Sequence, residues 1–104
     1  MKVNIITGNP VVAKLQGRLD TTAAVEVSPD FQSLNQYAAG QLVIDCSELE
    51  YISSSGLRLL LALRKEVAAK NGKLQIRNVN EDILQIFKIT GFFSLFEIVN
   101  WALI

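Results

Sequence analysis

The sequence predicts an α/β (α+β) fold in which a mixed sheet of four or five strands is covered mainly by helices, in the order ββαβαβαβ. Short apolar runs of strand length alternate along the chain with segments of helical periodicity. The first two runs, residues 1–6 and 11–16, are separated only by the turn residues Gly8-Asn9-Pro10, which indicates a hairpin. Helices between the later runs imply crossover connections, and therefore strands of both orientations.

Length and composition limit the class of protein. The 104 residues suffice for one hydrophobic core and are too few for two, so we expect a single domain over residues 1–104. Half of the residues are hydrophobic, which is typical of a globular chain. Ten basic and ten acidic residues cancel and are scattered, which argues against nucleic-acid binding. No apolar run is long enough to span a bilayer, so we expect no membrane insertion and a cytoplasmic protein.

The residue types that carry most catalysis are scarce. The chain has no histidine, which removes the commonest general base and the commonest metal ligand. Its single cysteine, Cys46, ends an apolar run and is interpreted as a small core residue. Asp20 and Asp45 could form a carboxylate pair, but no nucleophile, base or nucleotide-binding loop accompanies them. We therefore expect a protein that is not an enzyme and that holds no cofactor and no metal.

The first helix is the hardest element to place, because Pro29 would disrupt a helix that ran through it. Ser28 is a good N-cap residue and Pro29 suits the first helical position, so the pattern favours a helix at residues 29–38 that Gly40 ends. Residues 21–27 would then form at most a short helical turn, for which Asp20 offers a capping side chain.

The remaining elements follow from the same signals. Leu59 and Leu63 make the apolar arc of the next helix broader than one sheet contact requires, and Arg64 lies within that arc as a stem near the helix end. The apolar residues 101–104 either dock on the domain or form an interface. In order, we expect a buried strand at 42–44, a loop, a helix at 55–70, a strand at 73–77, a helix at about 81–89 capped by Asn78 or Asn80 and ended by Gly91, and a turn and last strand within 92–99.

Three serines, Ser53, Ser54 and Ser55, stand where the leucine-rich helix begins. Backbone N–H groups and the positive end of the helix dipole converge there, which suits a phosphate, either bound or covalently attached. Serines at this position are also what a plain helix cap requires, and the residues alone leave that alternative open. Asp45 and Ser47 are interpreted as turn-forming residues.

Three segments together resemble the STAS domain, and more narrowly the bacterial anti-sigma factor antagonists. They are Gly17-Arg18-Leu19-Asp20, the block from residue 43 to residue 57, and Ile89-Thr90-Gly91-Phe92. The resemblance extends from the hairpin to Phe96, and its middle block is the specific part. It implies a protein that sequesters an anti-sigma factor, itself a serine kinase, while unphosphorylated, and that releases it once phosphorylated. It also implies a serine phosphatase that resets the switch.

The resemblance also implies particular residues. The family pattern D-S-S-G-L falls on residues 53–57, which makes Ser54 the phosphate acceptor, with Ser53 and Ser55 as the alternatives. Ser53 stands where the family commonly has aspartate, and Asp20 matches the acidic residue after the second strand. The implied phosphorylation loop and partner surface comprise Asp20, Ser53, Ser55, Gly56, Leu57 and Arg58. The alternative function is a constitutive STAS interaction subunit, such as one that supports the ATPase of a lipid-transport ABC system.

Overall fold

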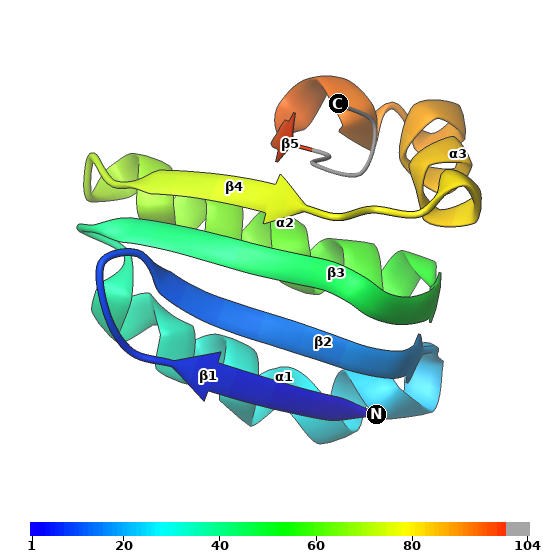
Figure 1. The fold of residues 1–104 in the computed structure, drawn as a ribbon, viewed down its shortest axis with the longest axis horizontal. Coiled ribbons are helices and arrows are strands. Elements are labelled where there is room, and N and C mark those ends of the chain that lie inside the picture. Colours follow the sequence, from blue (N-terminus) through cyan, green and yellow to red (C-terminus); the bar gives the residue numbers. More distant parts are fainter. Residues whose placement is uncertain (100–104) are drawn as a thin grey trace.

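The computed structural model describes residues 1–99, and its elements follow the predicted order ββαβαβαβ (Figure 1). The predicted role of residues 101–104 lies outside the described part. The elements are β1 (Lys2–Ile6), β2 (Val11–Leu19), α1 (Thr21–Leu34), the short 3-10 helix η1 (Asn35–Tyr37), β3 (Gln41–Ile52), α2 (Ser54–Ala69), β4 (Lys73–Arg77), α3 (Glu81–Thr90), the 3-10 helix η2 (Phe92–Leu95) and β5 (Glu97–Val99).

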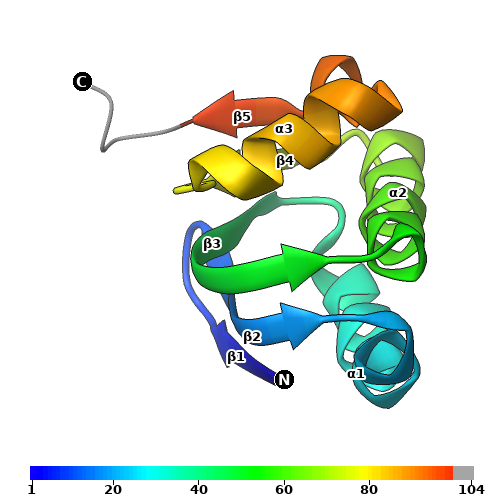
Figure 2. The ribbon, with the colours of Figure 1, turned by 90° about the vertical axis from the view of Figure 1, so that its right-hand side faces the viewer.

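The five strands form one mixed sheet in the order β1-β2-β3-β4-β5. β1 runs antiparallel to β2, as the predicted hairpin requires, and the other neighbouring strands are parallel. Figure 2 shows that α1 and α2 lie side by side against one face of the sheet, while α3 lies near the β4 side. The predicted mixed sheet is therefore confirmed, with its main helical cover on a single face.

The central strand β3 is longer than predicted. Its buried start is followed not by a loop but by more strand, up to Ile52, because β2 continues alongside it and pairs with it as far as Leu19. Of the turn-forming residues in this stretch, Ser47 is exposed and Asp45 is half-buried, whereas Cys46, Leu49 and Ile52 are buried. Two register shifts between β2 and β3 adjust the pairing along the way.

The prediction for the first helix was wrong. α1 begins at Thr21 and runs through Pro29 to Leu34, instead of starting at Pro29. The Asp20 carboxylate caps it by accepting a hydrogen bond from the Ala23 N–H at 2.8 Å. Pro29 lies on the solvent side, where water can replace the missing hydrogen bond. Burial of the apolar face outweighs the cost of the proline; the buried residues are Ala23, Ala24, Val27, Phe31 and Leu34.

The other two helices match their predictions closely. α2 starts one residue earlier than predicted, with Ser53 as its N-cap, and Leu63 is a core residue at 2% exposure. Arg64 is not merely a stem near the helix end, because its Nε donates a hydrogen bond to the Leu95 carbonyl and so ties α2 to η2. α3 has Asn80 as its N-cap and Gly91, in the left-handed conformation, as its C-cap. None of the helices within residues 1–99 has the length and apolar character needed to cross a bilayer.

Candidate functional site

The site lies where two neighbouring strands end and the two helices that follow them begin. β2 leads into α1 through Asp20, and β3 leads into α2 through Ser53, as the two arrowheads in Figure 2 show. Leu19 pairs with Ile52 at the ends of these strands, and the Ser53 N–H donates to the Leu19 carbonyl at 2.8 Å. This bond holds the starts of the two helices next to each other, although they are far apart in sequence.

Ser53 is the cap of α2. Its Oγ accepts a hydrogen bond from the Gly56 N–H at 3.2 Å, its backbone is extended, and the residue is only 8% exposed. Serine and aspartate are both strong N-cap residues, so the geometry explains why serine can replace the aspartate that the resemblance places here. The replacement keeps the cap and removes one negative charge.

Ser54 is in a different environment. It is the first residue of α2, it is exposed, and its hydroxyl makes no hydrogen bond within residues 1–99. In the same described part of the chain, the backbone N–H groups of Ser54 and Ser55 also have no acceptor. Ser55 is half-buried. Of the three predicted serines, Ser54 is thus the most exposed.

Gly56 allows the start of α2 to sit tightly on the strand ends. A Cβ at this position would lie 2.7 Å from Cγ of Leu19 and 2.9 Å from Cγ1 of Ile52, closer than side-chain atoms pack. Leu57 follows with its side chain in the core, at 3% exposure. Gly56 and Leu57 are therefore buried, and they hold the start of α2, which carries the serines, against the strand ends.

The groups around the serines carry both signs of charge. The Asp20 carboxylate is held as the cap of α1, and the Arg18 guanidinium lies over the Tyr51 ring, 4.6 Å from its centroid. Arg58 is exposed and lies four residues after Ser54, which places both on the same side of α2.

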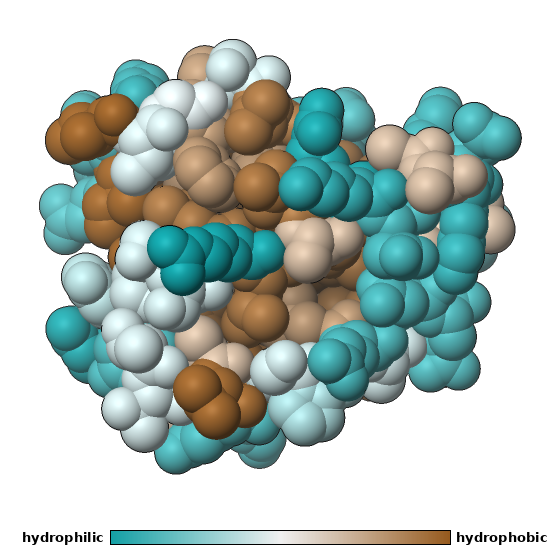
Figure 3. All heavy atoms as spheres, turned by 180° about the vertical axis from the view of Figure 1, so that it is seen from behind, coloured by the Kyte–Doolittle hydropathy of each residue, from teal (hydrophilic) through white to brown (hydrophobic). Residues whose placement is uncertain are grey.

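A shallow groove between α1 and α2 runs away from this site. Its near part is lined by Ala24, Val25 and Leu59, with Ser55 and Arg58 at its edge, and its far part reaches Phe31, Leu63 and Glu66. Figure 3 shows this helical face, on which hydrophobic residues are exposed between hydrophilic ones. Val25 alone is 74% exposed. Sequence reasoning missed the groove because Val25 was placed in a short turn and not on a full helix beside α2.

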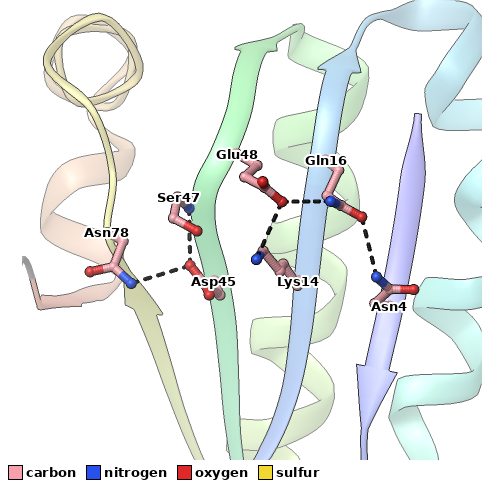
Figure 4. A network of polar contacts seen from close by, with 7 residues as sticks. All are labelled: Asn4, Lys14, Gln16, Asp45, Ser47, Glu48 and Asn78. Carbon is pink, nitrogen blue, oxygen red and sulfur yellow. Dashed lines mark hydrogen bonds and ion pairs between the residues drawn. The ribbon is translucent and has the colours of Figure 1, made fainter.

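The opposite face of the sheet is polar. Glu48 pairs with Lys14 at 3.3 Å and accepts a hydrogen bond from Gln16, while the Asp45 carboxylate accepts hydrogen bonds from the Ser47 N–H and from Asn78 (Figure 4). Burial acts to raise the pKa of Asp45, but these hydrogen bonds outweigh it and hold the pKa below its usual value. The pKa of Glu48 is also lowered, by its hydrogen bonds with Gln16 and Lys14 and by the Lys14 charge.

The two aspartates have separate hydrogen-bond partners. The Asp45 carboxylate is bonded on the sheet face, whereas the Asp20 carboxylate caps α1. Desolvation in the core raises the pKa of the Cys46 thiol to about 12, so the thiol stays protonated. The structure confirms Cys46 as a buried residue. Within residues 1–99, no group of three or more His, Cys, Asp or Glu side chains is placed to hold a metal ion.

A mixed sheet with two helices on one face, and a serine-rich helix start where β3 ends, is the architecture of a STAS-type domain. The chain belongs to the STAS domain family, whose profile matches residues 2–101. BtrV of Bordetella bronchiseptica is 29% identical over 90 residues, which are 86% of this chain and 78% of that protein. The anti-sigma-B factor antagonist of Bacillus subtilis is 26% identical over 90 residues, which are 86% of this chain and 82% of that protein.

Two solved structures of another anti-sigma factor antagonist, SpoIIAA, have the same fold. The unphosphorylated form matches with a TM-score of 0.68 and 20% identity, over 94% of this chain and 86% of the other. The phosphorylated form from Bacillus matches with a TM-score of 0.70 and 21% identity, over 95% and 88%. At this level of identity, the likeness shows the fold alone.

Proposed function

We propose that this protein is a cytoplasmic anti-sigma factor antagonist that acts as a phosphorylation-controlled switch. In its unphosphorylated form it binds an anti-sigma factor that is also a serine kinase. Phosphorylation of Ser54 releases that partner, and a serine phosphatase restores the binding form. The chain contributes a binding surface and a phosphate acceptor, and no catalysis of its own.

The observation that carries this proposal is that the three serines differ in exposure and in hydrogen bonding. Ser53 is buried and its Oγ is occupied as the helix cap, whereas the Ser54 hydroxyl is exposed and makes no hydrogen bond within residues 1–99. Ser55 is half-buried, at the edge of the groove between α1 and α2. A kinase that docked on this face would find Ser54 as the accessible hydroxyl.

Electrostatics supports a switch that leaves the backbone in place. A phosphoserine carries about −1.5 to −2 charges at neutral pH. At the start of a helix, the dipole and the free N–H groups stabilise such a charge, so the fold tolerates it. The groove beside Ser54 would then change its charge while its shape stayed the same.

The test combines phosphosite mapping with binding. We expect incubation with ATP and the cognate anti-sigma kinase to place phosphate on Ser54, and Ser54→Ala to abolish it, with Ser55→Ala as the matched control that still accepts phosphate. Ser54→Ala should bind the partner and Ser54→Asp should bind it at least about tenfold more weakly, a difference of about 1.4 kcal/mol. If both variants bind every partner equally, the switch is wrong and the constitutive interaction subunit becomes the better description.

A further inference from the structure

Arg58 stands apart from the other arginines of the chain. Arg18 lies over the Tyr51 ring, Arg64 donates to the Leu95 carbonyl, and Arg77 donates to Gln75. Arg58 is exposed and has no hydrogen bond, ion pair or ring contact within residues 1–99. An arginine side chain that is neither packed nor paired is available for a partner that the unmodified chain does not supply.

The spacing of Ser54 and Arg58 along α2 favours a contact between their side chains. Helical side chains tilt toward the N-terminus, so a residue covers the turn that precedes it, and residues four apart share one face. An anion followed by a cation four residues later is also the favourable order for such a pair. Ser54 and Arg58 have this spacing at the first turn of α2.

We propose that Arg58 is an internal phosphate clamp, which pairs with the phosphate on Ser54 and thereby leaves the edge of the groove. This inference rests on Ser54 being the acceptor, as in the proposed function. Arginine binds phosphate oxygens through paired N–H groups, and the free N–H groups of Ser54 and Ser55 supply further donors.

With this clamp, phosphorylation would change the charge at the edge of the groove in two ways. Among residues 1–99, Arg58 is the only charged side chain that lines the groove at its Ser54 end. Phosphorylation would add negative charge beside the groove and, in the same step, withdraw its positive charge. A partner whose carboxylate meets Arg58 would lose that contact in addition to meeting the new repulsion.

Other charges lie near the start of α1, where Arg18, Asp20 and Glu26 line one hollow. A carboxylate close to the phosphate would raise its second pKa. The contribution of Arg58 is therefore measured as a difference between variants that keep all three of these residues. Lys65→Gln provides the matched control, because it removes one exposed positive charge from α2 at a distance of more than two turns from Ser54.

The experiment uses protein with phosphoserine installed at position 54 during synthesis, so that no kinase is needed. The second pKa of the phosphate is measured by ³¹P NMR titration in the otherwise unchanged protein and in its Arg58→Gln, Arg58→Lys and Lys65→Gln variants. From the size of charge-assisted pairs, we expect Arg58→Gln to raise this pKa by roughly half a pH unit, Arg58→Lys by less, and Lys65→Gln by about 0.1 or less. The Arg58 Nε–H resonance should also shift as the phosphate ionises.

Equal phosphate pKa values in the unchanged protein and Arg58→Gln, or an Arg58 Nε–H signal that ignores the titration, would overturn the clamp. This result is separate from failure of the proposed function. If the kinase does not modify Ser54, the proposed function fails while the titration still reports on the pair. If the kinase does modify Ser54 but the titration shows no pair, the switch stands without the clamp.

Discussion

Two substitutions of Ser53 test its role as the cap of α2. One removes the capping oxygen, and the other introduces the aspartate that the family commonly has at this position. Ser53→Ala removes the Oγ that accepts from the Gly56 N–H at 3.2 Å, and the residue is only 8% exposed, so water does not readily take its place. Losing an N-cap hydroxyl costs about 1 kcal/mol, within a range of about 0.5–2 kcal/mol. The burial places this case in the upper half of the range. For a chain of this size, ~1 kcal/mol lowers the Tm by roughly 4 °C or more.

Ser53→Asp provides the other half of the comparison. The carboxylate restores the acceptor and interacts favourably with the helix dipole, by about 0.3–1 kcal/mol, which offsets part of the cost of burying it. We expect Ser53→Asp to lie within about 0.5 kcal/mol of the parent in urea unfolding followed by far-UV circular dichroism. The control Ser54→Ala, at an exposed position without a hydrogen bond, should be neutral to within about 0.5 kcal/mol. If Ser53→Ala is as stable as Ser54→Ala, the capping role is refuted.

Three further predictions concern packing, reactivity and pH. Gly56→Ala drives a methyl group to within 2.7 Å of a strand side chain, so overpacking of about 1–3 kcal/mol should exceed the smaller gain in helix propensity, and urea unfolding would detect the loss. Stability equal to the parent would show that the helix start shifts freely. Cys46, with its pKa raised to about 12 by burial, should resist a thiol reagent at pH 8 until denaturant is added; rapid labelling of the native protein would contradict this. Because the pKa of Asp45 is lowered on folding, its contribution to stability is present above pH ~4 and is lost as the pH falls through the folded-state value. Asp45→Asn should therefore flatten the acid limb of the stability–pH curve, and an unchanged slope would disprove this origin.

The order of elements was predictable because local signals and burial agree along most of the chain. They disagree at two places. Around Asp45 and Ser47, turn-forming residues conceal a strand whose alternate residues are buried, and only pairing with the full length of β2 reveals it. At Pro29, the cost of a proline inside a helix is outweighed by burial of the apolar face of α1. That face extends over the whole helix, so a short window of sequence around Pro29 does not reveal it.

The candidate site was located by its residue types, but its parts could not be told apart. Three consecutive serines offer the same chemistry, and the difference between Ser53 and Ser54 comes from the Leu19 carbonyl at the end of β2 and the Gly56 N–H in the first turn of α2. The groove was missed for a related reason. It exists only because α1 begins early enough to lie beside α2, with Val25 on its exposed side.

The bond from the Ser53 N–H to the Leu19 carbonyl has a consequence for substrate recognition. Many modifying enzymes read a short, extended peptide, but Ser54 is held at the start of a helix that is fastened to a neighbouring strand. We therefore expect any kinase or phosphatase that acts on Ser54 in the native protein to recognise a folded shape and not a linear motif. A synthetic peptide of this segment would be a poor substrate, and the unfolded chain would escape modification, so the signal would report only on protein that has folded.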